Sequence, residues 1–322
     1  MYVNHSQLVP DEVLQRLSRE PAPGAQPEPS ARHTTEQAEA ATLTRHAELL
    51  VFDCRQTQSL PGLRIEDPEA AQDVAVQRCA EETAQMLRFL QEAFQRNSID
   101  GAGMTLLSSV HYGRRFNNAM WNGLQAVYGD GDGALFVDFT RGADVIGCVL
   151  AHGLTQHTLQ LDYAGEAGGL KESLSDCLGA MFRQWRLQHD AAGADWRIGC
   201  EVIGPVLQQR GCTCLRDMSD PGGAHCLAPQ PVQYAQLQPG LDPHSASGPP
   251  NLAFCSACRQ LGGYSWEGVG QAWWRVLATT GPAPRLGLAE FAARTRQAAA
   301  ELFGPASGAV SAVDAGWRNV GL

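Results

Sequence analysis

Lysine is almost missing from this sequence, because Lys171 is the only lysine among 24 basic residues. Basic residues as a class are also outnumbered, since 34 acidic residues give a formal net charge of −10 and a pI near 5.3. A chain without a basic stripe has nothing to neutralise a phosphate backbone. Nucleic-acid binding is therefore excluded from the expected functions.

Long apolar runs are absent as well. No stretch approaches the roughly 18 residues that a membrane span requires, so we expect no membrane partner. The N-terminus, MYVNHSQLVPDEVLQRL, has no basic region followed by an apolar one and is not a recognisable secretory signal. Cytoplasmic residence and export without such a signal both stay open. The ten cysteines are scattered along the chain, which favours buried reduced thiols over a disulfide framework.

The first 50 residues differ in composition from the rest. Residues 8–17 (LVPDEVLQRL) have the pattern of a short amphipathic helix, and residues 21–32 (PAPGAQPEPSAR) are typical of a flexible linker. Residues 34–49 are consistent with a second, polar helix. This region is either a mobile tail or a prosegment that docks on the body of the protein.

From residue 48 onward the patterns are those of a folded domain. Strand signals occur at residues 48–54, 104–113 and 134–139, and helical periodicity occurs at residues 70–97 and 143–159. Beyond residue 165 the signals are mainly helical. We predict an α+β fold with an α+β lobe over residues 51–158, a helical lobe over residues 159–322, and a long helix at their junction.

That junction helix carries the most informative motif, Cys148-Val149-Leu150-Ala151-His152. Two metal ligands four residues apart on a helix are separated by roughly 40° around its axis, so both can reach one ion. Cys148 and His152 satisfy this spacing. His152 and His157 do not, because five residues place them roughly 140° apart.

The sequence around this motif resembles the thermolysin-like neutral zinc metallopeptidases, in particular the short protealysin-like branch. The resemblance rests on the segment VHYGRRFNNAMWNGLQAVYGDGDGALFVDFTRGADVIGCVLAHGLTQHTLQLDYAGEAGGLKESLSD and continues in RDMSDP, HSASGPPNLAF, GGYSWE and AVSAVDAGWRNVGL. It extends from about residue 49 to residue 322. It implies the two-lobed fold of that family, and residues 1–50 loosely resemble its prosegment.

The resemblance implies a zinc site with one altered ligand and no catalytic base. The family's His-Glu-x-x-His falls on Cys148 to His152, so the first histidine has become cysteine and the glutamate has become Val149. The third zinc ligand falls on Glu172, and the aspartate that orients the first histidine falls on Asp176. Thiolate, imidazole and carboxylate are all zinc ligands, so Zn²⁺ binding is compatible with this set. The alternative is that Cys148 is a small buried packing residue.

The resemblance also implies that the substrate-binding residues are kept. Asn118 and Ala119 match the pair that holds the substrate main chain, with Trp121 beside them, and Arg216 matches the arginine that binds a substrate carbonyl. The two oxyanion-stabilising positions fall on Tyr163 and His244. The family's aspartate that precedes this histidine is Pro239 here, with Asp242 nearby but offset.

The family's calcium site is expected to be lost. Asp144 and Asp195 keep two carboxylate positions, but three others read Arg183, Arg197 and Cys200. Guanidinium groups cannot coordinate Ca²⁺, which takes oxygen ligands. We therefore predict no bound calcium, and expect the arginines to pair with the remaining aspartates.

Loss of the base predicts little or no peptidase activity, because a positioned general base typically contributes about 10²–10⁴-fold. We expect a cleft that binds a peptide or protein without cutting it, and that the chain's own N-terminal segment can occupy. The alternative is an active zinc endopeptidase with a Cys-His-Glu site and another base such as Glu166.

Other cysteines form weaker patterns. Cys212 and Cys214 with His225 and Cys226 are compatible with a second metal site, a disulfide, or loose thiols in a loop. A final group is expected to pack in the core: Cys255, Cys258, Trp266, Trp273 and Trp274.

Overall fold

A six-stranded mixed sheet organises the first part of the chain. The computed structural model describes residues 6–19 and 48–322. The strands are β1 (Ser6–Gln7), β2 (Leu49–Asp53), β3 (Leu63–Arg64), β4 (Leu106–Val110), β5 (Ala119–Trp121) and β6 (Ala126–Tyr128), in the order β1-β5-β6-β4-β2-β3. β2, β4 and β6 run parallel, whereas β1, β5 and β3 pair antiparallel with their neighbours. The edge next to β5 is therefore formed by the N-terminal segment.

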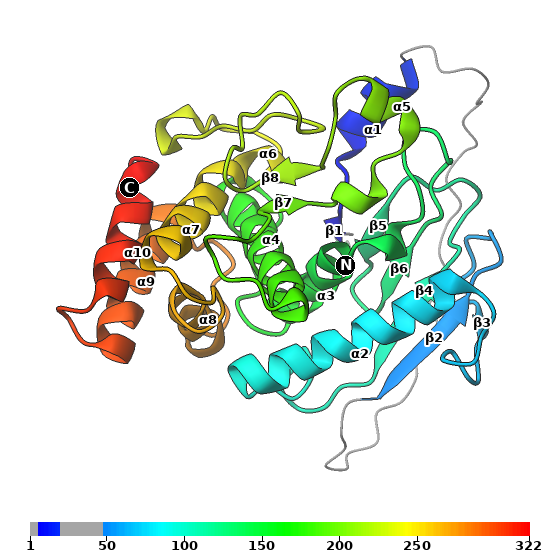
Figure 1. Cartoon of the computed structure of the whole chain (residues 1–322), viewed down its shortest axis with the longest axis horizontal. Helices are drawn as coiled ribbons and strands as arrows, with labels where there is room; N and C mark the ends of the chain where they lie inside the picture. The colour runs from blue at the N-terminus through cyan, green and yellow to red at the C-terminus, as the bar shows by residue number, and fades with distance from the viewer. Residues whose placement is uncertain (1–5, 20–47) are drawn as a thin grey trace.

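Helix α2 (Val74–Phe94) packs along β2 and β4 (Figure 1). It begins at Asp73, whose carboxylate accepts hydrogen bonds from the next turn's amides, and it ends at Gln95 in the left-handed conformation. Its buried positions recur every three to four residues, as the periodicity over residues 70–97 predicts. The helix supplies the apolar layer behind the sheet.

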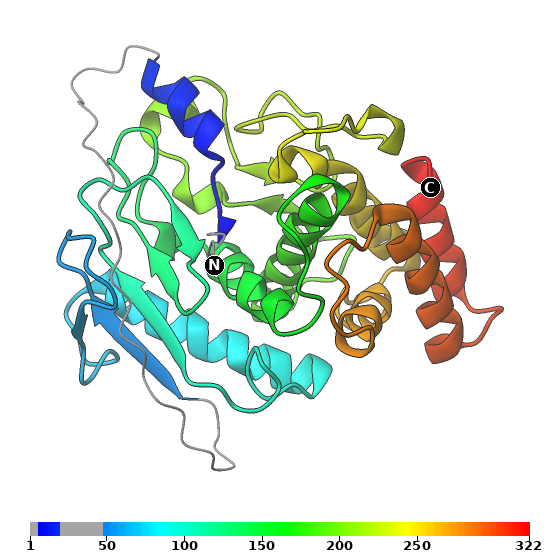
Figure 2. The same ribbon diagram turned by 180° about the vertical axis from the view of Figure 1, so that it is seen from behind.

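Helices α3 (Ala143–Gln156) and α4 (Gly165–Leu187) lie side by side at the centre (Figures 1 and 2). Two glycines permit this close packing, because a Cβ on Gly147 would lie 3.0 Å from the Cα of Gly179. A Cβ on Gly179 would in turn lie 2.5 Å from the Sγ of Cys148. The backbone of α4 therefore lies directly against the Cys148 side chain, leaving no room for a larger residue at Gly179.

The remaining helices follow α4 in the chain, and all but the first of them form the second lobe, which lies on the far side of α4 from the sheet (Figure 1). They are α5 (Pro205–Gln209), α6 (Pro243–Ala246), α7 (Gly248–Leu261), α8 (Val269–Thr279), α9 (Leu288–Phe303) and α10 (Gly308–Asn319), with a two-stranded sheet of β7 (Arg197–Ile198) and β8 (Arg216–Asp217). Its core includes Trp273, which stacks on Trp317 at 5.6 Å. Cys255 and Cys258 are buried on α7, and Trp266 is also buried. The predicted two-lobed α+β architecture is confirmed.

One local prediction is wrong, and two others lie largely outside the described residues. Residues 134–139 do not form a strand, and only an isolated bridge joins Phe136 to Ile203 before a 3₁₀ helix at Phe139–Arg141. The run is apolar because Phe136 and Phe139 anchor a loop in the core. The linker at 21–32 lies outside the described residues, as does the helix expected at 34–49 except for residues 48 and 49, of which Leu49 belongs to β2.

No helix within residues 6–19 and 48–322 combines the length and apolar character that crossing a membrane requires.

Candidate functional site

The N-terminal segment lies against β5 in an extended conformation (Figure 2). Ser6 pairs with Trp121 and Gln7 with Met120, and the amide of Leu8 donates to the carbonyl oxygen of Ala119 at 2.9 Å. Leu8 is buried in this position. The segment is bound through its main chain, in the manner of an added strand.

After Pro10 the chain forms helix α1 (Asp11–Arg19). Val13 and Leu17 are buried on its inner face, and Arg16 donates from Nη2 to the carbonyl oxygen of Leu227 at 3.1 Å. The amphipathic pattern predicted for residues 8–17 therefore corresponds to an extended stretch followed by a helix that packs on the body.

Asn118 holds both polar groups of one residue in this segment. Its Oδ1 accepts from the Val9 amide at 2.9 Å, and its Nδ2 donates to the Val9 carbonyl oxygen at 2.9 Å. Nδ2 also donates to the Gln7 side chain at 2.7 Å. Asn118 and Val9 are both fully buried. The side chain thus binds an extended backbone without depending on the identity of the bound residue.

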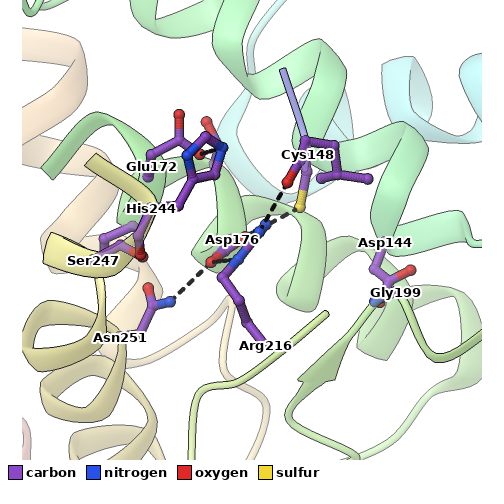
Figure 3. A network of polar contacts seen from close by, with 12 residues as sticks. Asp144, Cys148, Glu172, Asp176, Gly199, Arg216, His244, Ser247 and Asn251 are labelled. Atoms are coloured by element: carbon purple, nitrogen blue, oxygen red, sulfur yellow. Dashed lines mark hydrogen bonds and ion pairs between the residues drawn. The ribbon is translucent and has the colours of Figure 1, made fainter. Parts of the chain in front are cut away.

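Arg216 links this segment to a buried carboxylate (Figure 3). Its Nε and Nη2 donate to the two oxygens of Asp176 at 2.8 and 2.7 Å, while Nη1 donates to the carbonyl oxygen of Leu8 at 3.0 Å. Asn251 donates to Asp176 at 2.8 Å, and the thiol of Cys148 donates to it at 3.6 Å. These contacts offset the desolvation of a carboxylate that has no exposed surface.

His244 contacts the same segment from the second lobe. Its Nε2 donates to the Gln7 carbonyl oxygen at 2.7 Å and lies 3.5 Å from the hydroxyl oxygen of Tyr163. Burial opposes protonation of His244, but the Glu172 carboxylate at 3.4 Å, assisted by Asp242, outweighs it and raises the pKa of His244. Tyr163 and His244, the two predicted oxyanion-stabilising residues, therefore lie together, and His244 contacts the peptide carbonyl group of Gln7.

A different carboxylate lies near His244, since the sequence has Pro239 where the resemblance expects an aspartate. The Oδ2 atom of Asp242 lies 3.4 Å from Nδ1 of His244 and also accepts from the Ser245 amide at the start of α6. A carboxylate thus faces the outer nitrogen of His244 from a position offset by three residues.

His152 and Glu172 form the part of the site that fits a metal ion. Ser175 donates its hydroxyl proton to the Lys171 carbonyl oxygen at 3.1 Å, so it accepts from Nδ1 of His152 at 3.2 Å. Nε2 of His152 then carries the lone pair, 3.7 Å from Oε1 of Glu172. That oxygen is buried and has no hydrogen-bond partner among the described residues. Burial lowers the pKa of His152 well below its usual value, which keeps the imidazole neutral.

Cys148 does not join this pair. Among the described residues, three metal-ligating side chains with all donor atoms within 4.8 Å of one another occur only at Cys214, His225 and Cys226. The ligand atoms of Cys148, His152 and Glu172 are therefore not all within 4.8 Å of one another. Its side chain is shorter than a histidine's and ends beside Asp176, and burial raises its pKa well above the usual value.

Val149, at which the resemblance predicts the base position, is buried and has no atom that can accept a proton. Glu166 is engaged elsewhere, because its Oε1 accepts from the Tyr234 hydroxyl at 2.8 Å and its Oε2 from the Leu288 amide at 2.8 Å. No geometric reason therefore favours Glu166 as a replacement base.

Arg183 binds oxygens of the residues to which the resemblance assigns the family's calcium site. Its Nη1 donates to Asp144 at 2.7 Å, and its Nη2 donates to the carbonyl oxygens of Asp195 and Arg197 at 2.7 and 2.6 Å. Asp144 also accepts from the Gly199 amide at 2.9 Å (Figure 3). The guanidinium group supplies a cation to oxygens that would otherwise face one another.

Other residues lie at the periphery of the site or outside it. Trp121 is buried, and its indole donates to Gln156 at 2.8 Å, so it braces α3. His157 is the C-cap residue of α3. The ammonium of Lys171 lies 5.5 Å from the centre of the Tyr163 ring.

Sequence reasoning assigned no role to Ser175 or Asn251. Ser175 lies one turn after Glu172 on α4, a spacing that could have signalled a shared face. Asn251 comes from α7, and nothing in the sequence places it beside Asp176.

Comparisons with known proteins agree with this geometry. Residues 38–156 match the family model described as thermolysin metallopeptidase, catalytic domain, and residues 159–322 match the thermolysin metallopeptidase, alpha-helical domain. The chain is 37% identical to an extracellular metalloprotease of Pectobacterium carotovorum subsp. carotovorum, covering 84% of this chain and 80% of that protein. It is 33% identical to Protease PrtS of Photorhabdus sp. (strain Az29), covering 100% of this chain and 85% of that protein.

Among solved structures, the precursor of protealysin, a metalloproteinase from Serratia proteamaculans, superposes with a TM-score of 0.86 at 33% identity. The match covers 98% of this chain and 99% of that one. The similarity therefore includes the N-terminal region that lies along β5.

Proposed function

The chain belongs to the thermolysin metallopeptidase family, and we propose that it is a member with little or no peptidase activity that retains peptide-backbone binding. The observation that carries this proposal is a contrast within one site. Val149 stands where a proton acceptor is needed, while Asn118 and Arg216 bind the main chain of residues 8 and 9.

The chemistry of hydrolysis explains why Val149 is decisive. Metallopeptidases need a residue that takes the proton from the attacking water, and losing such a base costs about 10²–10⁴-fold in rate. A Zn²⁺ ion, if held by His152 and Glu172, would polarise a peptide carbonyl group and make water more acidic. Tyr163 and His244 would still stabilise negative charge on the carbonyl oxygen, but proton removal has no assigned acceptor.

The ligand set also differs from the ordinary one. The neutral imidazole of His152 and the carboxylate of Glu172 face one another. Cys148 lies beside Asp176 instead. Zinc held by two protein ligands is weaker than zinc held by three, so we propose low zinc occupancy unless Cys148 changes rotamer. Calcium has no role in this proposal, because Arg183 already binds the oxygens around Asp144.

The bound N-terminal segment defines what the site recognises. Main-chain groups of Gln7, Leu8 and Val9 receive hydrogen bonds or donate them, whereas Leu8 and Val9 contribute apolar burial. We propose that a peptide or protein ligand in extended conformation competes with residues 6–9 for these contacts. An active enzyme that uses another base is the competing function.

The test is chelator-sensitive hydrolysis of a quenched peptide library by the zinc-supplemented full chain and by Leu8→Asp/Val9→Asp, which weakens the docked segment. We expect no cleavage above background from either protein. The double substitution Cys148→His/Val149→Glu, in the same background, should restore hydrolysis, while Cys148→His/Val149→Gln is its matched control without a base.

Cleavage by the unaltered Cys148-Val149 site that chelator abolishes would overturn the proposal. So would a rebuilt variant that is folded and zinc-loaded yet inactive, because other positions would then block the reaction. Circular dichroism and bound-zinc stoichiometry establish that each variant is comparable.

A further inference from the structure

A second cluster of metal-ligating side chains lies outside the peptide-binding site. Cys214 comes just before β8, and His225 and Cys226 end the loop that follows β8. Their donor atoms all lie within 4.8 Å of one another. We propose that Cys214, His225 and Cys226 form a structural binding site for a thiophilic divalent cation of the Zn²⁺ class.

The distance between the thiols fits a shared ion. The Sγ atoms of Cys214 and Cys226 are 3.9 Å apart. Tetrahedral zinc with Zn–S bonds of about 2.3 Å places two thiolates about 3.8 Å apart. A disulfide needs sulfurs about 2.05 Å apart, so this pair is not a disulfide.

His225 has a carboxylate partner, as metal-ligating histidines often do. Its Nε2 lies 3.0 Å from Oδ2 of Asp217, an acceptor, so Nε2 carries the proton and Nδ1 keeps its lone pair. The other oxygen of Asp217 accepts from the amide and the hydroxyl of Ser219, at 2.8 and 2.7 Å, which fixes the carboxylate. Such a carboxylate partner sets the tautomer and the ring orientation of a ligating histidine.

The backbone brings the three side chains together before any ion binds. Cys214 and Cys226 form a parallel bridge, in which the Leu227 amide donates to the Cys214 carbonyl oxygen at 2.9 Å. A Cβ on Gly223 would lie 2.6 Å from Nδ1 of His225, so the ring position depends on glycine there. The cluster is therefore assembled by main-chain contacts that do not involve the thiols.

Cys212 is not part of the cluster, because its thiol donates to the Cys214 carbonyl oxygen at 3.4 Å. Three protein ligands leave a fourth tetrahedral position, which solvent can reach because the His225 side chain is 33% exposed. An ion held by three protein ligands keeps this open position, so it would exchange with the medium more readily than an ion in a closed site of four protein ligands.

The cluster lies next to two segments that contact the N-terminal region. Arg216 lies two residues after Cys214, and Leu227, which accepts a hydrogen bond from Arg16 of α1, directly follows Cys226. An ion here would tie together the two segments against which the N-terminal region docks. It would do so without contacting His152 or Glu172.

The test is Co²⁺ binding to the full chain in a Cys148→Ala background, which removes the other candidate thiol ligand. We expect a thiolate-to-cobalt charge-transfer band with one ion per cluster, displaced by Zn²⁺. Cys214→Ser/Cys226→Ser should abolish the band, whereas the matched control Cys255→Ser/Cys258→Ser, buried on α7, should keep it. His225→Ala keeps both thiols and should weaken binding, and Asp217→Asn should weaken it by about 10–100-fold.

An unchanged cobalt band in Cys214→Ser/Cys226→Ser would overturn the proposal, as would unchanged affinity in His225→Ala. Mass spectrometry supplies the remaining check on protein purified without oxidant. A Cys214–Cys226 disulfide, seen as the loss of two hydrogens, would show that the pair is a redox crosslink and would also overturn it.

Discussion

The Nη1 atom of Arg216 donates a hydrogen bond to the carbonyl oxygen of Leu8, 208 residues earlier in the chain. The other nitrogens of the same guanidinium group bind Asp176 in a two-pronged arrangement. One side chain therefore connects the carboxylate beneath the altered motif with the segment that lies along β5. A substitution at Asp176 should therefore affect the N-terminal segment, and a change in that segment should affect the environment of Asp176.

Arg216→Ala should lower the free energy of unfolding by about 3–5 kcal/mol, because it leaves the buried Asp176 carboxylate without its partner. Arg216→Lys keeps the charge but loses the two-pronged geometry, so its cost should be smaller. Chemical denaturation measures both, with Arg318→Ala, an exposed site, as control. A loss below about 1 kcal/mol in Arg216→Ala would contradict the role of the pair.

Asn118→Ala should release the N-terminal segment locally. The Val9 amide and carbonyl oxygen would lose their partner at a buried position, which costs about 1–3 kcal/mol. Amide hydrogen exchange at Leu8 and Val9 should accelerate, while exchange at Phe89 in α2 should not change. Unaltered protection of Val9 would mean that the Asn118 contacts do not hold the segment.

Arg183→Met should destabilise the protein by about 3–5 kcal/mol, since Asp144 would remain buried without a cation. Adding Ca²⁺, or a chelator selective for Ca²⁺ over Zn²⁺, should leave the melting temperature of the unaltered protein unchanged. Arg197→Met, which removes an exposed pair with Asp195, is the control and should have a small effect. A calcium-dependent rise in the melting temperature of the unaltered chain would show that Arg183 does not replace the ion.

His111 should make stability depend on pH. The hydrogen bond to Asp130 at 2.7 Å raises the pKa of His111 to about 9, against the opposing effect of burial. Its stabilising contribution is complete below the unfolded-state value of about 6.5 and is lost as the pH rises through about 9. We expect a loss on the order of 1–3 kcal/mol between these values, after allowing for solvent screening.

Histidine proton resonances followed by NMR would give the pKa of His111 directly, and unfolding at several pH values would give the linkage. His111→Gln should reduce the dependence over this range, with the remainder including the contribution of His244, whereas His189→Gln, at an exposed site, should leave it unchanged. A His111 midpoint near 6.5 would contradict the prediction.

Helices with long amphipathic patterns were predictable from the sequence, as α2 shows, because one buried face repeats over many turns. Strands β5 and β6 were not identified, since three residues each are too short for an alternating pattern and their pairing is set by distant segments. The apolar run at 134–139 predicted a strand wrongly, because burial of Phe136 and Phe139 gives the same pattern in a loop.

The candidate site was likewise predictable only in part from the sequence. Helical spacing and the family resemblance placed Cys148 and His152 on one face, but spacing does not determine which atoms a short side chain reaches. Cys148 ends at Asp176 because the Gly179 backbone lies against it and its side chain is short. Cys214 and Cys226 lie close together because a β-bridge joins their two segments. The sequence does not predict that bridge, so it left a metal site, a disulfide and loose thiols open as alternatives.

The position of Lys171 has a practical consequence. Lys171 is the only lysine in the sequence, and its ammonium lies over the Tyr163 ring beside the residues that hold the N-terminal segment. Burial lowers the pKa of Lys171, so a larger fraction of the amine is unprotonated and nucleophilic than for a solvated lysine. An amine-reactive fluorophore therefore has one side-chain target in the whole molecule. A fluorophore attached to Lys171 would report whether the peptide-binding site is occupied.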